Sequence, residues 1–489
     1  MFEGVKVCER TKIIFVGAFL GLLLSKGMAL IPGLGLDDYA ALQQDRNPLF
    51  YISQGRYFQA VIQLILTNIN ISPTSIYWPV EILFFISAAV AITGGIVFTT
   101  RRQGSAYIQA GVAAIIGSHP YISEYFSFRE SLITQGLSFL FLAVFFIRLL
   151  NIEKDNEIRF SNIKWLAIIL VLIASTQQTV FLVALFFVLT RFAIDTTYAG
   201  GIKYVGRALR ANYALFSIFA ISAVIYGVIF FSTGKLFNIS GDGRGNLIGV
   251  IDFYPRVLNV ISLINNVMFE GEPVLSKSVK IVLLIAVFGS ILRVGSKTPQ
   301  AALIAVVLFS TLMLGSVILV AISKTWWPVP RAIYGVSFAF GLTLIYTSVF
   351  IDDWQKSFFS IISVSAIGLS FHSSSMLYDQ YRLNRWDLWT AGKIVSDLTS
   401  RNVMSDKKII LVGAHWNYPV GLKTVEGDLN ISALSVSWSV KYLIGESTGM
   451  VWDVTSVASN DICKPGLFWP SPESIHVYPE EVVVCMGSR

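Results

Sequence analysis

The residues best suited to chemistry lie in the first polar stretch of the chain. Asp37-Asp38 directly follows an apolar run, Asp45-Arg46 comes next, and Gln54-Gly55-Arg56-Tyr57-Phe58 opens an amphipathic stretch. A carboxylate can take the proton of an attacking hydroxyl group, and an arginine can hold a leaving phosphate. These are the groups that sugar transfer from a lipid phosphate requires. The two aspartates would equally suit a solvated turn that caps a helix after Gly35.

A second polar stretch, residues 119–130, lies between two apolar runs and carries His119 and Glu124. His119 could polarise an acceptor hydroxyl group. A hydrogen bond at a helix end, with Pro120 stopping the helix, is the simpler interpretation of the same residue. Charged residues at the edge of a membrane tend to be functional, which makes Glu124 a candidate.

A third stretch carries Lys324 and Arg331 on either side of Trp326-Trp327. The two cations could clamp the phosphate of a prenyl lipid, and tryptophans can stack on sugar rings. The same residues would also form an interfacial aromatic belt with cations that reach toward water. The run Gly241-Asp242-Gly243-Arg244-Gly245-Asn246 is glycine-rich like a phosphate loop, but without a strand before it and a helix after it we predict a flexible loop.

The composition indicates a membrane environment. Of the 489 residues, 54% are hydrophobic and 14% are charged, and the mean hydropathy is +0.65. A soluble domain carries about 25% charged residues. The net charge of +7 does not indicate nucleic-acid binding, because Lys and Arg lie at the ends of apolar segments instead of clustering on one polar face. Lys26, inside the first run, is expected to extend its amine to the membrane surface. If it faced a cavity instead, it would be a partner for a carboxylate or a phosphate.

The three cysteines, Cys8, Cys463 and Cys485, are too few for a disulfide scaffold. No CxxC or HxxxH spacing is present, so the sequence contains no zinc motif. Cys463 and Cys485 share the polar C-terminal segment. A bridge between them is allowed if that segment lies in an oxidising compartment.

Ten apolar runs predict the membrane-spanning segments. Several are shorter than the ~20 residues of a simple span, as expected of helices that line a cavity within the membrane. The runs are Ile13–Pro32, Pro79–Thr99, Ser105–Ser118, Ser131–Leu150, Trp165–Leu189, Ala211–Phe231, Val279–Leu292, Ala301–Ile322, Ala332–Ile351 and Phe358–Phe371.

The run Trp165–Leu189 decides the topology. As one helix it would place the cationic residues 191–210 outside, whereas a hairpin broken at Ser175-Thr176-Gln177-Gln178 returns them to the cytoplasm. Polar side chains at lipid depth also favour a break that faces a cavity, which makes Gln177 and Gln178 candidate site residues. The hairpin would consist of two short spans of ~12 residues. The sequence therefore predicts 11 spans, a cytoplasmic N-terminus and an outer segment from His372 onward.

The C-terminal segment has a different pattern. We predict a transmembrane domain at residues 1–372 and a second domain at residues 373–489. In the second domain, Asp379–Asn402 has the pattern of an amphipathic helix, and Lys408–Gly413 and Glu480–Met486 have the pattern of strands. The predicted fold is an all-α membrane bundle followed by a small α/β domain.

The order of these motifs resembles the GT-C glycosyltransferases and, more closely, the Gtr-type O-antigen glucosyltransferases of enteric bacteria and their phages. The resemblance rests on a first span that ends in Asp37-Asp38, on Gly55-Arg56 followed by an aromatic residue, and on Gln177-Gln178 at the hairpin tip. It also rests on Asp379-Gln-Tyr-Arg-Leu-Asn384 with Asp387 after the last span, and on the overall length.

The resemblance implies a GT-C-like bundle in a bacterial inner membrane, with the C-terminal domain in the periplasm. It implies transfer of glucose from undecaprenyl-phosphate-glucose to a sugar of the lipopolysaccharide O-antigen repeat, which converts the serotype. A carboxylate of Asp37-Asp38 would be the catalytic base, and Glu124 would lie near the donor phosphate or a metal. Expected functional partners are a flippase and a cytoplasmic-face prenyl-phosphate glucosyltransferase. A divalent cation is allowed but not required.

A polytopic transporter or flippase of a lipid-linked sugar is the alternative. Transporters usually have repeated halves and ionisable residues near the middle of the membrane. The two halves of this chain differ, and most acidic residues lie at the ends of apolar runs. The sequence therefore favours the enzyme.

Overall fold

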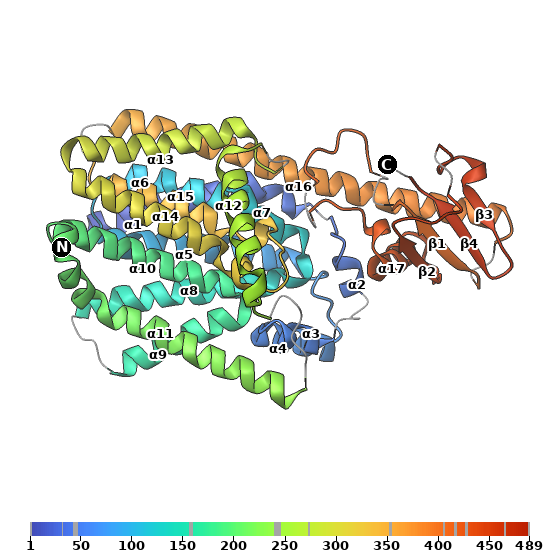
Figure 1. The fold of residues 1–489 in the computed structure, drawn as a ribbon, viewed down its shortest axis with the longest axis horizontal. Coiled ribbons are helices and arrows are strands. Elements are labelled where there is room, and N and C mark those ends of the chain that lie inside the picture. The colour runs from blue at the N-terminus through green and yellow to red at the C-terminus, as the bar shows by residue number, and fades with distance from the viewer. Residues whose placement is uncertain are drawn as a thin grey trace.

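The computed structural model describes residues 2–31, 33–42, 47–155, 160–238, 246–271, 274–351, 355–403, 406–414, 418–425, 429–463 and 466–487. Asp45-Arg46 and the glycine-rich residues 241–245 lie outside these ranges. The chain forms a helical bundle and a smaller mixed domain that lie end to end (Figure 1). We call the end of the bundle that adjoins the smaller domain the domain end.

The axes of the bundle helices are nearly aligned with one another, and successive helices run up and down this common axis (Figure 1). They arise from the apolar runs, because a helix satisfies its own backbone hydrogen bonds wherever water is absent. The helices are α1 (Phe2–Lys26), α5 (Tyr77–Thr100), α6 (Ala106–Ser118), α8 (Arg129–Asp155), α9 (Phe160–Thr176), α10 (Gln178–Tyr198), α11 (Val205–Leu236), α13 (Lys277–Lys297), α14 (Pro299–Ile322), α15 (Gly335–Ser348) and α16 (Gln355–Ser400).

Eight of the helices within the described residues are long and apolar enough to cross a membrane, which makes the chain a multi-pass membrane protein. Three further apolar helices, at Ala106–Ser118, Asn162–Thr176 and Gly335–Ser348, are shorter than the ~20 residues that a simple span needs. The predicted fold class, a helical membrane bundle, is therefore confirmed. Helix length alone does not establish the predicted number of 11 spans.

The predicted break in the fifth apolar run is present. α9 ends at Thr176 and α10 begins at Gln178, and Gln177 between them is extended, with φ −154° and ψ 109°. The two helices pack against each other and have 17 and 21 residues. They are longer than the predicted pair because each continues beyond the apolar run into polar residues. The chain thus reverses at a cluster of polar side chains at the domain end.

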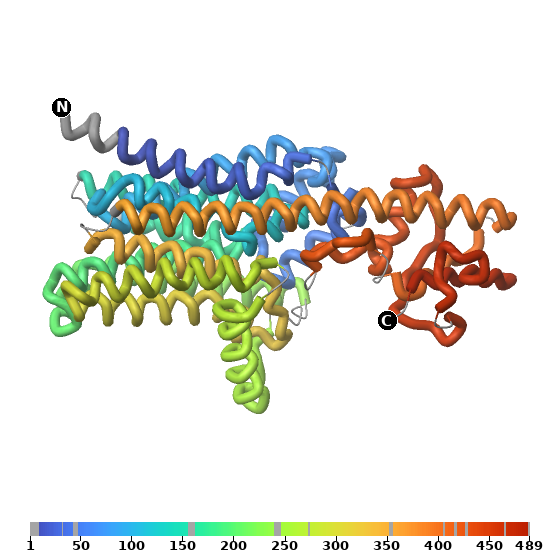
Figure 2. Tube along the Cα trace, turned by 90° about the horizontal axis from the view of Figure 1, so that it is seen from above, coloured from blue at the N-terminus to red at the C-terminus, as the bar shows by residue number. Residues whose placement is uncertain are grey.

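α16 joins the bundle to the smaller domain without a break (Figure 2). It has 46 residues, and at 1.5 Å per residue it is about 70 Å long. The boundary predicted between residues 372 and 373 falls inside this helix. The apolar core of the bundle includes Leu377, and a separate core in the smaller domain includes Ala391 further along the same helix.

The C-terminal domain packs a four-stranded sheet against helices. The two predicted strands are confirmed as β1 (Lys408–Val412) and β4 (Glu481–Cys485), which pair in parallel. β2 (Val454–Val457) pairs in parallel with β1, and β3 (Ile475–Val477) pairs antiparallel with β4, so the order is β2-β1-β4-β3. α17 (Ser437–Thr448) packs against β2 and α16.

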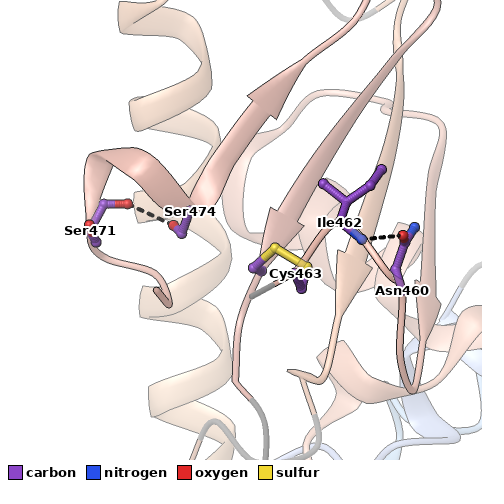
Figure 3. Close-up of a disulfide and its surroundings, with 6 residues drawn as sticks. Asn460, Ile462, Cys463, Ser471 and Ser474 are labelled. Carbon is purple, nitrogen blue, oxygen red and sulfur yellow. Dashed lines mark hydrogen bonds between the residues drawn. A yellow bond between two sulfur atoms is a disulfide. The ribbon is translucent and has the colours of Figure 1, made fainter. Parts of the chain in front are cut away.

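Cys463 and Cys485 form a disulfide that ties the loop after β2 to the end of β4 (Figure 3). The loop is fixed locally by a hydrogen bond of 3.0 Å from the Ile462 N–H to Asn460 Oδ1. The bridge that the sequence allowed is therefore present in the fold.

Short helices cover the domain end. α12 (Phe253–Phe269) runs across the direction of the bundle helices and projects beyond them (Figures 1 and 2). The others are α2 (Asp38–Leu42), α3 (Pro48–Ser53), α4 (Tyr57–Asn68), α7 (Pro120–Ser123) and the 3₁₀ turns η1 (Gly27–Leu30), η2 (Glu124–Ser127), η5 (Pro330–Ala332) and η7 (Ala433–Ser435).

Candidate active site

Buried polar contacts hold the first loop against the domain end of the bundle. Arg129, at the start of α8, donates from Nη2 to the carbonyl oxygens of Ala29 and Ile31, at 2.8 and 2.9 Å. Its Nη1 lies 3.6 Å from Glu81 Oε1 on α5, and both side chains are buried. These contacts connect three segments and fix the direction in which the chain leaves η1.

Asp37 and Asp38 are adjacent in sequence but have different surroundings. Asp38 is fully buried, and its carboxylate accepts hydrogen bonds from the Gly35 N–H at 2.8 Å and the Glu130 N–H at 3.0 Å. Burial raises the pKa of Asp38 to about 7. The hydrogen bonds from these two N–H groups and the positive charge of Arg129 lower the pKa and offset part of this rise. Asp38 thus ties the first loop to the N-terminus of α8, which is a structural task.

Asp37, in contrast, lines a cavity of about 80 Å³, which we call the Asp37 cavity. Its Oδ1 accepts a hydrogen bond of 2.9 Å from Trp438 Nε1 in the C-terminal domain. The cavity is formed by segments from the first loop, the second loop, the hairpin tip and the turn before α15. Its polar lining includes Asp37, Tyr51, Gln54, Arg56, Tyr125, Glu130, Gln135, Gln177 and Arg331.

The backbone conformation at position 55 explains why a glycine precedes Arg56. Gly55 has a φ of +75°, a left-handed conformation that side chains disfavour. A Cβ atom at Gly55 would lie 2.2 Å from Tyr226 Oη on α11, and this hydroxyl donates to the Gly55 carbonyl at 3.1 Å. Glycine therefore allows the loop to pack onto α11, and Arg56 follows at the start of α4, where it lines the Asp37 cavity.

The hairpin tip contributes two glutamines with different roles. Gln177 Nε2 donates to Tyr125 Oη at 2.8 Å and to Thr179 Oγ1 at 2.9 Å. Its Oε1 is buried at the cavity and has no hydrogen-bond partner within the described part of the chain. Gln178 Nε2 donates to the Gln54 carbonyl at 2.9 Å, which joins the hairpin to the first loop. Gln177 thus offers an acceptor atom to a ligand, whereas Gln178 holds the loop.

Glu124 orients Arg331. The carboxylate of Glu124 is fully buried, and its two oxygens accept from the Arg331 side chain and backbone N–H, each at 2.5 Å. The guanidinium carbon lies 3.8 Å from the Phe128 ring centroid and 4.5 Å from that of Trp327. Arg331 lines the Asp37 cavity and Glu124 does not, so the acid acts through the arginine.

A larger cavity of about 280 Å³ adjoins the first, and we call it the α11 cavity. Arg56, Gln177 and Trp327 line both cavities. Its apolar lining comes from α11, the end of α14 and the stretch before α12, with Phe230, Leu247, Leu319, Val320 and Ile322. Polar residues complete the wall, among them Gln54, Gln178, Thr179, Asn246, Ser323 and Thr325. A cavity with both apolar and polar lining suits an amphiphilic ligand.

Four of the candidate site residues lie outside both cavities: Asp38 and Glu124, described above, and Lys324 and His119. Lys324 is exposed, and its backbone pairs with Asn246 at 2.7 Å. His119 is fully buried, and its Nδ1 accepts from the Tyr121 N–H at 3.3 Å as the N-cap of α7. Neither side chain is part of the cavity lining. His119 therefore makes a hydrogen bond at a helix end, which was the simpler of the two interpretations of its position before Pro120.

The surroundings of His119 favour its neutral form. Burial lowers the pKa of His119 to about 3, and the positive charges of Lys26 and Lys280 add to the effect.

Lys26 does not reach the membrane surface as expected. It is fully buried, and its Nζ donates to Ser25 Oγ at 3.0 Å and to the His119 carbonyl at 3.3 Å. Lys26 stays inside because these carbonyl and hydroxyl oxygens replace water as acceptors.

The polar motif on α16 holds the C-terminal domain and the first loop in place. Asn384 Nδ2 donates to the Leu34 carbonyl at 3.2 Å and also to Tyr39 Oη. Asp387 accepts from Ser432 Oγ at 2.6 Å and from the Ala433 N–H at 2.8 Å. A second acid, Asp379, accepts from Lys423 N–H and Thr424 Oγ1, at 3.1 and 2.9 Å. This motif therefore positions the site without lining the Asp37 cavity.

Several cavity residues were not among the sequence candidates. Tyr51, Tyr125, Glu130 and Gln135 all line the Asp37 cavity. Gln54 and Trp327, which belong to motifs that the sequence indicated, line it as well. Gln135 is buried within the membrane-spanning helix α8, and its Oε1 has no hydrogen-bond partner within the described ranges. A buried amide inside an apolar run is costly unless it faces a cavity or a partner, and this signal was available in the sequence.

No three His, Cys, Asp or Glu side chains within the described ranges are grouped closely enough to hold a metal ion. The cations that line the Asp37 cavity are Arg56 and Arg331. Comparison with known proteins finds no family model and no curated protein that matches the chain.

The cavity brings together two acids, Asp37 and Glu130, with two arginines and amide acceptors. Such a set can bind an anionic group at the arginines and deprotonate a hydroxyl group at the carboxylate. The amide oxygens of Gln135 and Gln177 can accept hydrogen bonds from hydroxyl groups of a ligand. The arrangement suits a polyhydroxylated substrate that is linked to a phosphate.

Proposed function

We propose that this protein is a membrane glycosyltransferase that moves a sugar from a polyprenyl phosphate to a saccharide acceptor. The observation that carries the proposal is the composition of the Asp37 cavity. The carboxylate of Asp37 lies in the same small space as the guanidinium groups of Arg56 and Arg331. Glu130 lines this space as well, and its Oε2 accepts a hydrogen bond of 3.4 Å from Tyr51 Oη. Asp37 and Arg56 belong to the first loop, whereas Arg331 comes from η5, the turn before α15.

In the proposed reaction, an acceptor hydroxyl oxygen attacks the anomeric carbon of the donor sugar. Asp37 takes the hydroxyl proton, and the bond between the anomeric carbon and the phosphate oxygen breaks. Polyprenyl phosphate leaves with the additional negative charge, which Arg56 and Arg331 stabilise. Gln135 and Gln177 accept hydrogen bonds from sugar hydroxyl groups and orient the ring.

The α11 cavity supports a lipid-linked donor. Arg56 and Gln177 line both cavities, so a phosphate at Arg56 has a polar space on one side and an apolar space on the other. The apolar wall includes Phe230 and Leu247, which suit the first isoprene units of a lipid. A transporter would need a path through the bundle, and the two cavities instead lie at its domain end.

The resemblance in the sequence makes the proposal more specific. The donor is undecaprenyl-phosphate-glucose, and the acceptor is a sugar of the lipopolysaccharide O-antigen repeat, so that the product is a changed serotype. The protein lies in a bacterial inner membrane with its domain end in the periplasm. Arg101 and Arg102 directly follow α5, and Lys203 and Arg207 lie where α11 begins, at the end of the bundle opposite the smaller domain (Figure 1). These cations support this orientation. A flippase and a cytoplasmic-face prenyl-phosphate glucosyltransferase supply the donor.

Mass spectrometry of lipopolysaccharide tests the proposal. Cells that express the wild-type chain should add one hexose per O-antigen repeat, and cells that express Asp37→Asn at equal levels should add none. The purified protein should transfer glucose from undecaprenyl-phosphate-glucose to the same acceptor. An unchanged lipopolysaccharide mass in cells that produce the folded wild-type protein, with donor and acceptor both present, would remove the proposed function.

A further inference from the structure

The C-terminal domain contributes a side chain to the proposed catalytic centre. Trp438, in the first turn of α17, donates from Nε1 to Asp37 Oδ1 at 2.9 Å, although the two residues are separated by 401 positions in the chain. The indole N–H is purely a donor, and a bond to an ionised carboxylate is stronger than one between neutral groups. Trp438 is thus a direct link between the smaller domain and Asp37.

Both partners of this hydrogen bond are anchored on α16. On one side, Tyr39 Oη accepts from Asn384 Nδ2, and Tyr39 follows Asp37 by two residues. On the other side, Asp387 accepts from Ser432 Oγ at 2.6 Å, at the start of the turn that leads into α17. One turn of α16 therefore fixes the separation between the first loop and α17.

The remainder of α17 keeps Trp438 in place. Val440, Leu443 and Ile444 are buried in the core of the C-terminal domain, while 53% of Trp438 is exposed. An exposed tryptophan contributes little to the domain core. Its position is set by the helix, and its N–H is directed at Asp37.

We propose that Trp438 is a positioning residue, which holds the carboxylate of Asp37 in the orientation that deprotonates the acceptor. The inference rests on the proposed function of the Asp37 cavity. Asp37 also lines the cavity that would hold the acceptor, so the carboxylate that Trp438 binds is the one that a substrate hydroxyl group would meet. The catalytic centre is then assembled from both domains, and the C-terminal domain is required for the chemical step.

Kinetics of the full-length protein, with undecaprenyl-phosphate-glucose and lipopolysaccharide as substrates, test this proposal. Trp438→Phe keeps an aromatic ring and removes the N–H. We expect kcat to fall about 10- to 100-fold, the usual loss when a reacting group is misplaced, while the KM for the acceptor and the unfolding temperature stay near wild-type values. The matched control is Trp389→Phe, a tryptophan of α16 that is 56% exposed, and its kcat should be unchanged.

The outcomes separate the two proposals. An active wild type with equal kcat in Trp438→Phe would overturn the positioning role and leave the proposed function intact. If kcat falls equally in Trp438→Phe and in Trp389→Phe, the positioning role is overturned. If the fall in Trp438→Phe comes with a lowered unfolding temperature, Trp438 only helps to dock the C-terminal domain, and the positioning role is again overturned. A folded wild type that transfers no sugar would remove both proposals.

Discussion

Glu124 accepts two hydrogen bonds from Arg331, one from the guanidinium group and one from the backbone N–H, both at 2.5 Å. The acid is fully buried, and 14% of the arginine side chain is exposed. Breaking a buried pair by removal of one partner costs about 3–5 kcal/mol in the interior of a protein, because the remaining charge is uncompensated.

Removal of the Glu124 carboxylate should therefore affect both stability and donor binding. We expect Glu124→Ala to lower the free energy of unfolding by about 3 kcal/mol and to raise the KM for the lipid-linked donor. Thermal unfolding in detergent and donor titration measure the two effects. The control is Lys324→Ala, a cation in the stretch before Arg331 that is exposed and lies outside both cavities. Equal effects of the two substitutions would contradict the role of Glu124.

The two adjacent aspartates should give different phenotypes. Asp37→Asn should lower kcat by about 10²-fold or more, as expected for loss of a general base, with little change in unfolding temperature. Asp38→Ala should destabilise the protein by about 1–3 kcal/mol for each buried N–H left without an acceptor. Transfer assays and thermal unfolding of both variants check this. A stable, inactive Asp38→Ala beside an active Asp37→Asn would reverse the assignment.

His119 should make stability depend on pH. Burial holds its pKa at about 3 in the folded protein, below the value of about 6.5 in the unfolded chain. Below pH 6.5 the unfolded state binds a proton that the folded state does not, so stability falls as the pH decreases. The loss should be about 2 kcal/mol between pH 6.5 and pH 5. His119→Asn keeps a helix cap and should abolish this component, as measured by thermal unfolding across the pH range.

The disulfide should stabilise the C-terminal domain. Cys463 and Cys485 are 22 residues apart, and closing a loop of this size contributes about 3 kcal/mol in the chain-entropy account. We expect Cys463→Ser to speed proteolysis of the C-terminal domain and leave the bundle intact. Cys8→Ser is the control. Equal protease resistance of the two variants, with and without reductant, would contradict the expectation.

Cysteine labelling tests the orientation of the bundle. Lys203 lies in the turn between α10 and α11, and Lys324 follows α14 at the domain end. A membrane-impermeant maleimide should label Lys324→Cys in intact spheroplasts and should label Lys203→Cys only after lysis. The opposite pattern would place the domain end in the cytoplasm.

The sequence was sufficient to predict the elements whose signal is local. The apolar runs gave the helices, and the polar cluster at Gln177 gave the break between α9 and α10. β1 and β4 were predictable because each contains four consecutive apolar residues after a charged one, beside polar turns. The short strands β2 and β3 lack that pattern, since their side chains are only partly buried.

The site was less predictable, because its composition depends on how helices rotate and pack. Hydropathy does not distinguish Asp37 from Asp38, and the difference arises from the contact between Asp38 and α8. Gln135 stands out in the sequence as an amide within an apolar run, but the cavity that it lines forms only when α8 packs against its neighbours. Trp438 is distant from Asp37 in the chain, and no local pattern links the two.

The unbroken course of α16 has a geometric consequence for variants of this chain. Each residue of an α-helix turns the chain by about 100° around the axis and advances it by about 1.5 Å. A single residue inserted between the bundle and Asn384 would therefore rotate the C-terminal domain about the axis and move the tryptophan of α17 away from Asp37. Such an insertion should abolish activity, because the two domains can no longer meet at Asp37.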